Sequence, residues 1–208
     1  MIRAIITLIS VALFIYGLYE NSQLIRICSK PVPILVLIWM TYSYKDKWLL
    51  GALGFSLLGD IILELPQFFP FAMGLASFLL AHILYIRRFL SVHVHKLWWP
   101  LIPITLYCGV LFSYMAPNLG ALFIPVSIYV LVIAAMLWSA SVYSYTQKNY
   151  LLILGAIFFV ISDSLIAINK FISPFSQARY AIIITYWLAQ YLIIIPLLAK
   201  QDHASHST

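Results

Sequence analysis

Residues 119–143 read LGALFIPVSIYVLVIAAMLWSASVY and contain no charged side chain. A helix needs roughly 20 consecutive, mostly apolar residues to cross the hydrocarbon of a bilayer, so this segment is long enough to span one. Residues 150–171, YLLILGAIFFVISDSLIAINKF, are almost as apolar but include Asp163 and Lys170. The two segments predict membrane-spanning helices, one of which carries ionisable side chains.

The composition extends this interpretation to the whole chain. Hydrophobic residues make up 64% of the 208 residues and charged residues 9%, and the mean hydropathy is +1.01. Soluble proteins contain about 45–50% apolar and about 25% charged residues. The net charge of +6 is spread singly between apolar segments, which indicates topology signals and headgroup contacts and excludes a nucleic-acid-binding surface.

Short charged or Pro-containing breaks divide the chain into apolar segments. They predict an all-α, polytopic transmembrane bundle of about eight helices at 2–20, 28–44, 48–65, 69–89, 97–115, 119–143, 150–171 and 178–199. The first segment lacks a small-residue cleavage site and is expected to remain as a span. We expect residues 1–200 to form one domain and residues 201–208 a polar, mobile tail.

The third and seventh predicted helices resemble each other. In each, a Phe precedes an Asp by five residues: Phe55 before Asp60 and Phe158 before Asp163. A parallel repeat of four plus four helices and a chance similarity of apolar helices both explain this pattern.

The Lys and Arg residues predict the orientation. With the N-terminus inside, the inner side collects eight of them and the outer side four, which favours cytoplasmic termini. We expect a multi-pass protein of the bacterial cytoplasmic membrane rather than of the endoplasmic reticulum.

Two of the six acids are expected inside the membrane. An ionised side chain at the centre of a span costs about 2.5–3.5 kcal/mol on insertion scales, so it needs a partner, a wet cavity or a function. Asp60 and Asp163 each have apolar residues on both sides and directly follow the small residues Gly59 and Ser162, whereas Glu64 lies near a helix end and favours an interfacial role. We predict a functional pair of aspartates. The alternative is that each aspartate binds a buried base and only stabilises the bundle.

Other polar side chains fall at comparable depths and at helical spacing. Lys30 precedes Pro31 at the expected outer start of the second helix, where it could pair with an aspartate or bind a phosphate. The residues predicted to bind substrate are Lys30, Ser56, His82, Tyr85, Asn169, Tyr186 and Gln190.

The sequence lacks the motifs of zinc proteases, serine hydrolases, P-loop proteins and dinucleotide-binding proteins. Its histidines have no acidic or cysteine neighbours at metal-ligand spacing. We therefore expect neither a metal nor an organic cofactor.

Several short motifs together resemble one family. They are Lys30-Pro31, the segment GALGFSLLGD at 51–60, Gly74 with Phe78, His82 and Tyr85, Gly155-Ala156 with Ser162-Asp163-Ser164, and Tyr186 with Gln190. In this order and spacing the chain resembles the YhhN family, which includes the lysoplasmalogenases. The resemblance implies eight helices, a lysophospholipid substrate, and hydrolysis of the vinyl ether of lysoplasmalogens to a fatty aldehyde and glycerophosphoethanolamine or glycerophosphocholine. Its essential acids correspond to Asp60 and Asp163.

A carboxyl pair suits this chemistry. A vinyl ether resists base and yields to acid through an oxocarbenium ion, a problem that glycosidases solve with two carboxyl groups. Because burial and a neighbouring like charge favour the neutral form of one of two carboxyl groups, a pair in a membrane can supply both an acid and a base.

The sequence is also compatible with other functions. A proton-coupled transporter also uses intramembrane carboxylates, and a scaffold needs no chemistry. An intramembrane aspartyl protease is disfavoured, because its G-x-G-D motif would place Gly where this chain has Leu57.

Overall fold

The computed structural model describes residues 2–67, 70–95 and 97–205, with side chains up to residue 200. All regular elements in this part of the chain are helices, as the sequence predicts. The chain divides into two compact units, residues 1–81 and 82–208.

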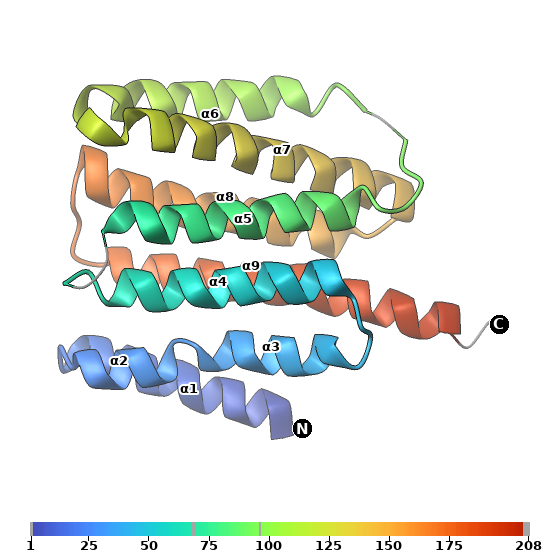
Figure 1. The fold of residues 1–208 in the computed structure, drawn as a ribbon, viewed down its shortest axis with the longest axis horizontal. Helices are drawn as coiled ribbons and strands as arrows, with labels where there is room; N and C mark the ends of the chain where they lie inside the picture. Colours follow the sequence, from blue (N-terminus) through green and yellow to red (C-terminus); the bar gives the residue numbers. More distant parts are fainter. Residues whose placement is uncertain (1, 68–69, 96, 206–208) are drawn as a thin grey trace. The chain divides into compact units, whose positions relative to one another are not determined.

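The first unit contains α1 (Ile2–Tyr19), α2 (Gln23–Ser29), α3 (Val32–Tyr42), α4 (Lys47–Glu64) and the first part of α5 (Phe71–Phe89). In this unit α1 packs against α2 and α3, and α3 packs against α4 (Figure 1). The α5 segment contacts α4, where the Ser77 hydroxyl donates a hydrogen bond to the Phe55 carbonyl over 2.7 Å.

The second predicted helix starts earlier than expected and is broken. Ser22 caps α2, its hydroxyl accepting from the Ile25 amide, so the span begins at Gln23 rather than at residue 28. Pro31 lacks an amide hydrogen and interrupts the helix between α2 and α3. Lys30 therefore lies at a break within a span of Gln23–Tyr42, and not at its outer start.

The second unit contains the rest of α5, then α6 (Leu101–Met115), the 3₁₀ turns η1 (Ala116–Asn118) and η2 (Gly120–Leu122), α7 (Phe123–Gln147), α8 (Tyr150–Ala167), the π-helical turn η3 (Ile168–Ile172) and α9 (Ala178–Ser205). The most extensive packing joins α8 to α9. A Cβ at Gly155 of α8 would lie 2.9 Å from the carbonyl oxygen of Ala189 and the amide nitrogen of Ile193, so the absence of a side chain permits this approach. The tail predicted from residue 201 starts as part of α9, and residues 206–208 lie outside the described residues.

The helices α4 and α8 begin in the same way. Lys45 and Lys148, with φ of 51° and 56°, adopt the left-handed conformation before each helix. The next residues, Asp46 and Asn149, cap the helices by accepting hydrogen bonds from the amides of Leu49 and Leu152. Such caps satisfy backbone donors that have no partner within the helix.

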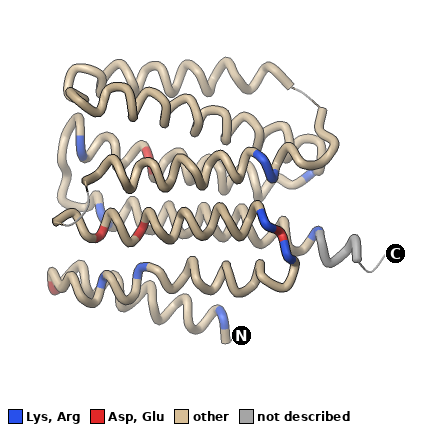
Figure 2. Tube along the Cα trace, viewed as in Figure 1, with Lys and Arg blue, Asp and Glu red and all other residues tan. Residues whose placement is uncertain are grey.

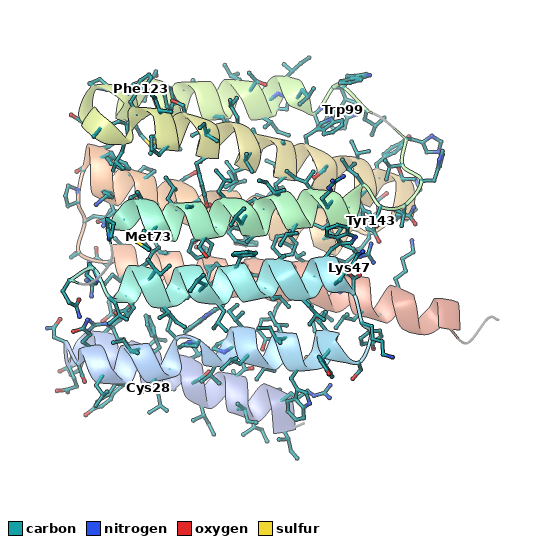
Figure 3. The ribbon with its side chains drawn as sticks, in the orientation of Figure 1. Cys28, Lys47, Met73, Trp99, Phe123 and Tyr143 are labelled. Carbon is teal, nitrogen blue, oxygen red and sulfur yellow. The ribbon has the colours of Figure 1, made fainter. Side chains whose placement is uncertain are left out.

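Seven helical segments of the described chain are long and apolar enough to cross a membrane. The remaining predicted span corresponds to α4, which is 18 residues long but includes Lys47, Asp60 and Glu64. Apolar side chains on α6 are strongly exposed at one-turn intervals, with Ile102 at 73%, Leu106 at 67% and Val110 at 50%, and the sticks along this helix are mostly carbon (Figure 3). Lipid is the solvent that suits this surface, and the chain is an integral, multi-pass membrane protein.

Candidate functional site

In the first unit, two basic and two acidic side chains form ion pairs between neighbouring helices, and we call Arg26, Lys30, Asp60 and Glu64 the α4 cluster. Figure 2 marks the Lys and Arg positions of the chain in blue and the Asp and Glu positions in red along the backbone. Arg26 Nε lies 2.6 Å from Glu64 Oε1, and Lys30 Nζ lies 3.4 Å from Glu64 Oε2. Lys30 Nζ also lies 3.9 Å from Asp60 Oδ1, so one ammonium group is shared by two carboxylates. Each of these charges is therefore balanced by an opposite charge inside the unit.

The α4 cluster is buried at Asp60 and Arg26, partly buried at Lys30 and Glu64, and supported by further hydrogen bonds. Asp60 is 3% exposed and Arg26 is 7% exposed. Arg26 Nη1 donates to the Gly17 carbonyl over 3.3 Å, and Gln23 Nε2 donates to the Glu64 carbonyl over 3.1 Å. Buried charges are tolerated when they are paired and hydrogen-bonded, as these are.

Two of the predicted residues, Lys30 and Asp60, come together in this cluster, while Ser56 is buried one helical turn before Asp60 on α4. Of the two roles left open for Lys30, the structure shows pairing with an aspartate. Sequence reasoning missed Arg26 and assigned Glu64 to the interface. Arg26 and Lys30 are four residues apart, as are Asp60 and Glu64, and this matching spacing could have indicated that the two pairs face each other. The predicted second helix starts after Arg26, which hides the match.

In the second unit, Asp163 on α8 is surrounded by groups from two other helices, and we call Asp163, Tyr129 and His82 the α8 cluster. The Tyr129 hydroxyl on α7 donates to Asp163 Oδ2 over 2.5 Å. His82 Nε2 on α5 lies 3.9 Å from the same oxygen. The Asp163 side chain is 12% exposed and that of His82 is 0% exposed. The carboxyl group thus has a hydroxyl group and an imidazole beside it.

Aromatic rings pack around the α8 cluster. The Phe159 ring, one turn before Asp163, lies 4.7 Å from the His82 ring and 5.6 Å from that of Tyr186 between centroids, both edge-on. The Tyr85 hydroxyl donates to Gln190 Oε1 over 2.5 Å, and both side chains are buried. Four of the residues predicted to bind substrate therefore lie around Phe159. The rings of His82 and Tyr186 contact its ring, and the Tyr85 ring lies 6.4 Å from it between centroids. Gln190 is connected to this group through its hydrogen bond with Tyr85.

Asn169 occupies a different place. Its Oδ1 accepts from the Phe175 amide over 3.1 Å, so it caps the backbone after the π-helical turn η3. Tyr107 and Tyr129 were not among the predicted residues, although Tyr107 donates to Ser164 beside Asp163 over 2.8 Å. Both tyrosines lie in apolar helices without a nearby motif, and nothing in a single sequence aligns their helices with α8.

The arrangement favours acid chemistry at Asp163. A carboxyl group within an apolar span can exchange a proton, and a neighbouring hydroxyl can stabilise the charge that remains. The Asp60 carboxylate instead has a cation within 3.9 Å that balances its charge.

The model of the YhhN family matches residues 25–197. The chain belongs to the YhhN family. The resemblance found from the sequence motifs is thereby confirmed.

Relatives of this YhhN protein carry a common name. Lysoplasmalogenase TMEM86B of Mus musculus is 30% identical over 193 residues, covering 89% of this chain and 79% of the relative. Lysoplasmalogenase TMEM86B of Rattus norvegicus is 31% identical over 189 residues, covering 84% and 73%. Lysoplasmalogenase of Mycobacterium bovis is 30% identical over 138 residues, covering 62% and 51%. No solved structure matches the chain.

Proposed function

We propose that this YhhN protein is a membrane ether hydrolase that cleaves the vinyl ether bond of lysoplasmalogens. The observation that carries the proposal is the similarity, over 89% of the chain, to a relative named as a lysoplasmalogenase. The products are a fatty aldehyde and glycerophosphoethanolamine or glycerophosphocholine. The apolar helices suit the alkenyl chain of such a substrate.

The reaction begins with proton transfer. A carboxyl group gives its proton to the alkene carbon that does not carry oxygen, which leaves an oxocarbenium ion on the neighbouring carbon. Water adds to that carbon and loses a proton, which restores the acid. The resulting hemiacetal breaks its bond to the glycerol oxygen, which takes up a proton, and releases aldehyde and alcohol, so the overall reaction consumes one water molecule.

We propose Asp163 as the proton donor and Asp60 as the second catalytic carboxylate. The hydroxyl and imidazole partners support the role of Asp163, and the Lys30 ammonium supports a charged role for Asp60. That the two acids serve one reaction stays a prediction from the sequence. The substrate-binding roles of Lys30, Ser56, His82, Tyr85, Asn169, Tyr186 and Gln190 likewise stay predictions.

We also propose the bacterial cytoplasmic membrane as the location, with both termini on the cytoplasmic side. The excess of Lys and Arg on the inner loops supports this orientation. Reporter fusions to each terminus test it, and activity of an exported reporter at either end would contradict it.

The proposal is tested with purified protein in lipid nanodiscs. A lysoplasmalogen and the matching alkyl-ether lysophospholipid are supplied separately, and aldehyde is measured by mass spectrometry. We expect aldehyde from the vinyl ether only, because an alkyl ether has no alkene carbon to protonate. Absence of aldehyde from both lipids would contradict the proposed function.

A further inference from the structure

Tyr129 forms a hydrogen bond with the Asp163 carboxyl group in the second unit. Its hydroxyl donates to Oδ2 over 2.5 Å, and His82 Nε2 lies 3.9 Å from the same oxygen. Both partners that the described chain provides therefore contact Oδ2. This leaves Oδ1 as the oxygen that can exchange a proton with a substrate.

The hydroxyl group of Tyr129 is held in place by its surroundings. Tyr129 is 8% exposed, and the His82 ring meets its ring edge-on at an interplanar angle of 87° and a centroid distance of 5.5 Å. The imidazole is itself packed against Phe159 at 4.7 Å. Rotation of the tyrosine ring away from Asp163 would break these contacts, so the hydrogen bond has a fixed direction.

We propose that Tyr129 is a positioning residue that places the catalytic proton of Asp163 on Oδ1. An oxygen that accepts a hydrogen bond from a hydroxyl acts as the carbonyl oxygen of a protonated carboxyl group, and the proton resides on the other oxygen. The proposal rests on the proposed function, because it assigns a role to Tyr129 in the same proton transfer.

Tyr129 also contributes after the proton has left. The Oδ1–H bond breaks, a C–H bond forms on the alkene carbon, and the electron pair stays on the carboxylate, where it is shared by both oxygens. A hydroxyl group already aimed at Oδ2 stabilises this developing charge without reorganising. A hydrogen bond to a charged group contributes enough to change a rate by about 10- to 100-fold.

The variant Tyr129→Phe removes the hydroxyl and keeps the ring. We expect kcat for lysoplasmalogen hydrolysis to fall about 10- to 100-fold with KM nearly unchanged, because the lost interaction strengthens only in the transition state. The matched control is Tyr107→Phe, which removes a tyrosine hydroxyl that donates to Ser164, the residue after Asp163, rather than to the carboxylate. A rise in KM at constant kcat, or an equal loss in both variants, would overturn the proposal.

Infrared spectroscopy tests the hydrogen bond between Tyr129 and Asp163 independently of enzyme activity. The carbonyl band of protonated Asp163 is identified by its loss in Asp163→Asn, over the pH range in which the protein stays folded. Because an accepted hydrogen bond lowers a carbonyl stretching frequency, Tyr129→Phe should move the band to a higher wavenumber and Tyr107→Phe should leave it in place. Absence of the band, or a band that Tyr129→Phe does not move, would overturn the inference.

A second modification covers the case in which Tyr129→Phe does not fold. 3-Fluorotyrosine at position 129 keeps the hydroxyl and makes it a stronger donor, so the carbonyl band should move to a lower wavenumber, and an unmoved band would overturn the inference. If the wild type releases no aldehyde but the band responds as described, the proposed function fails and the assignment of the Tyr129 hydrogen bond stands.

Discussion

The helices α4 and α8 place an aspartate at the same point and surround it differently. Each helix starts after a left-handed lysine and an Asp or Asn cap, is 18 residues long, and carries its aspartate 13 residues after its first residue, at Asp60 and Asp163. In the α4 cluster a shared ammonium group balances the carboxylate. In the α8 cluster a tyrosine hydroxyl and a histidine face the acid.

The difference shows that the neighbours, and not the position in the helix, decide what a buried carboxyl group can do. A carboxylate beside a cation suits the stabilisation of a positive oxocarbenium ion or the activation of water. A carboxyl group beside a hydroxyl suits the exchange of a proton. Substitutions in and around the two clusters test this division of roles.

The largest effects are expected from Asp163→Asn and Asp60→Asn. Because general acid–base catalysis typically contributes 10²- to 10⁴-fold, each variant should lower kcat/KM for aldehyde release by about this factor. The matched control is Asp46→Asn, the same substitution at a helix cap where Asn serves as well as Asp. Full activity in Asp163→Asn, with the protein folded and monodisperse, would remove Asp163 as the proton donor.

The next largest effect concerns the stability of the α4 cluster. Arg26→Met and Glu64→Gln each leave a buried charge without its nearest partner, which costs about 3–5 kcal/mol in the free energy of unfolding. The double variant should lose less than the sum of the two. Tyr129→Phe in the α8 cluster should cost less, about 1–3 kcal/mol, because it removes a single hydrogen bond. Denaturant unfolding in detergent measures all four proteins, and additive losses would contradict a buried ion pair.

The smallest effects concern glycines at helix contacts. Gly155→Ala should lower stability by about 1–3 kcal/mol, because its Cβ would meet α9 backbone atoms at 2.9 Å. Gly59→Ala in α4 should cost less, since its Cβ meets the ring of the Phe78 side chain rather than backbone atoms.

The control for both glycine variants is Gly54→Ala, where nothing lies within 4 Å of the new Cβ. It should stabilise the protein by about 0.5–1 kcal/mol, because alanine favours the helix. The apparent melting temperatures of the three variants rank them by stability. A larger loss for Gly59→Ala than for Gly155→Ala would contradict the packing described for α8 and α9.

Much of the fold could be predicted from apolar segments alone. The limits of α1, α4, α5 and α8 fall within four residues of the predicted ones, because charges and prolines mark the ends of spans. The predicted second span begins at residue 28 and so leaves out Arg26, which lies in α2 as a buried partner of Glu64. From sequence alone, a charged residue inside a membrane helix resembles the end of a span, because the residue that balances its charge is not known.

The candidate site could be predicted only in part. Asp60 and Asp163 stood out because ionised groups are costly in a membrane. Tyr129 did not stand out, because a neutral tyrosine in an apolar helix carries no such cost. The role of Tyr129 depends on which helix packs against α7. The hydrogen bond to Asp163 is a property of packing, which periodicity within one helix does not specify.

Hydrolysis in deuterated water tests whether the vinyl ether is cleaved by proton transfer to carbon. Lysoplasmalogen is cleaved by the purified protein in D₂O, and the aldehyde is reduced at once to the alcohol to prevent exchange. We expect one deuterium on the carbon next to the former aldehyde carbon in every product molecule. A product without deuterium at that carbon would contradict the proposed mechanism.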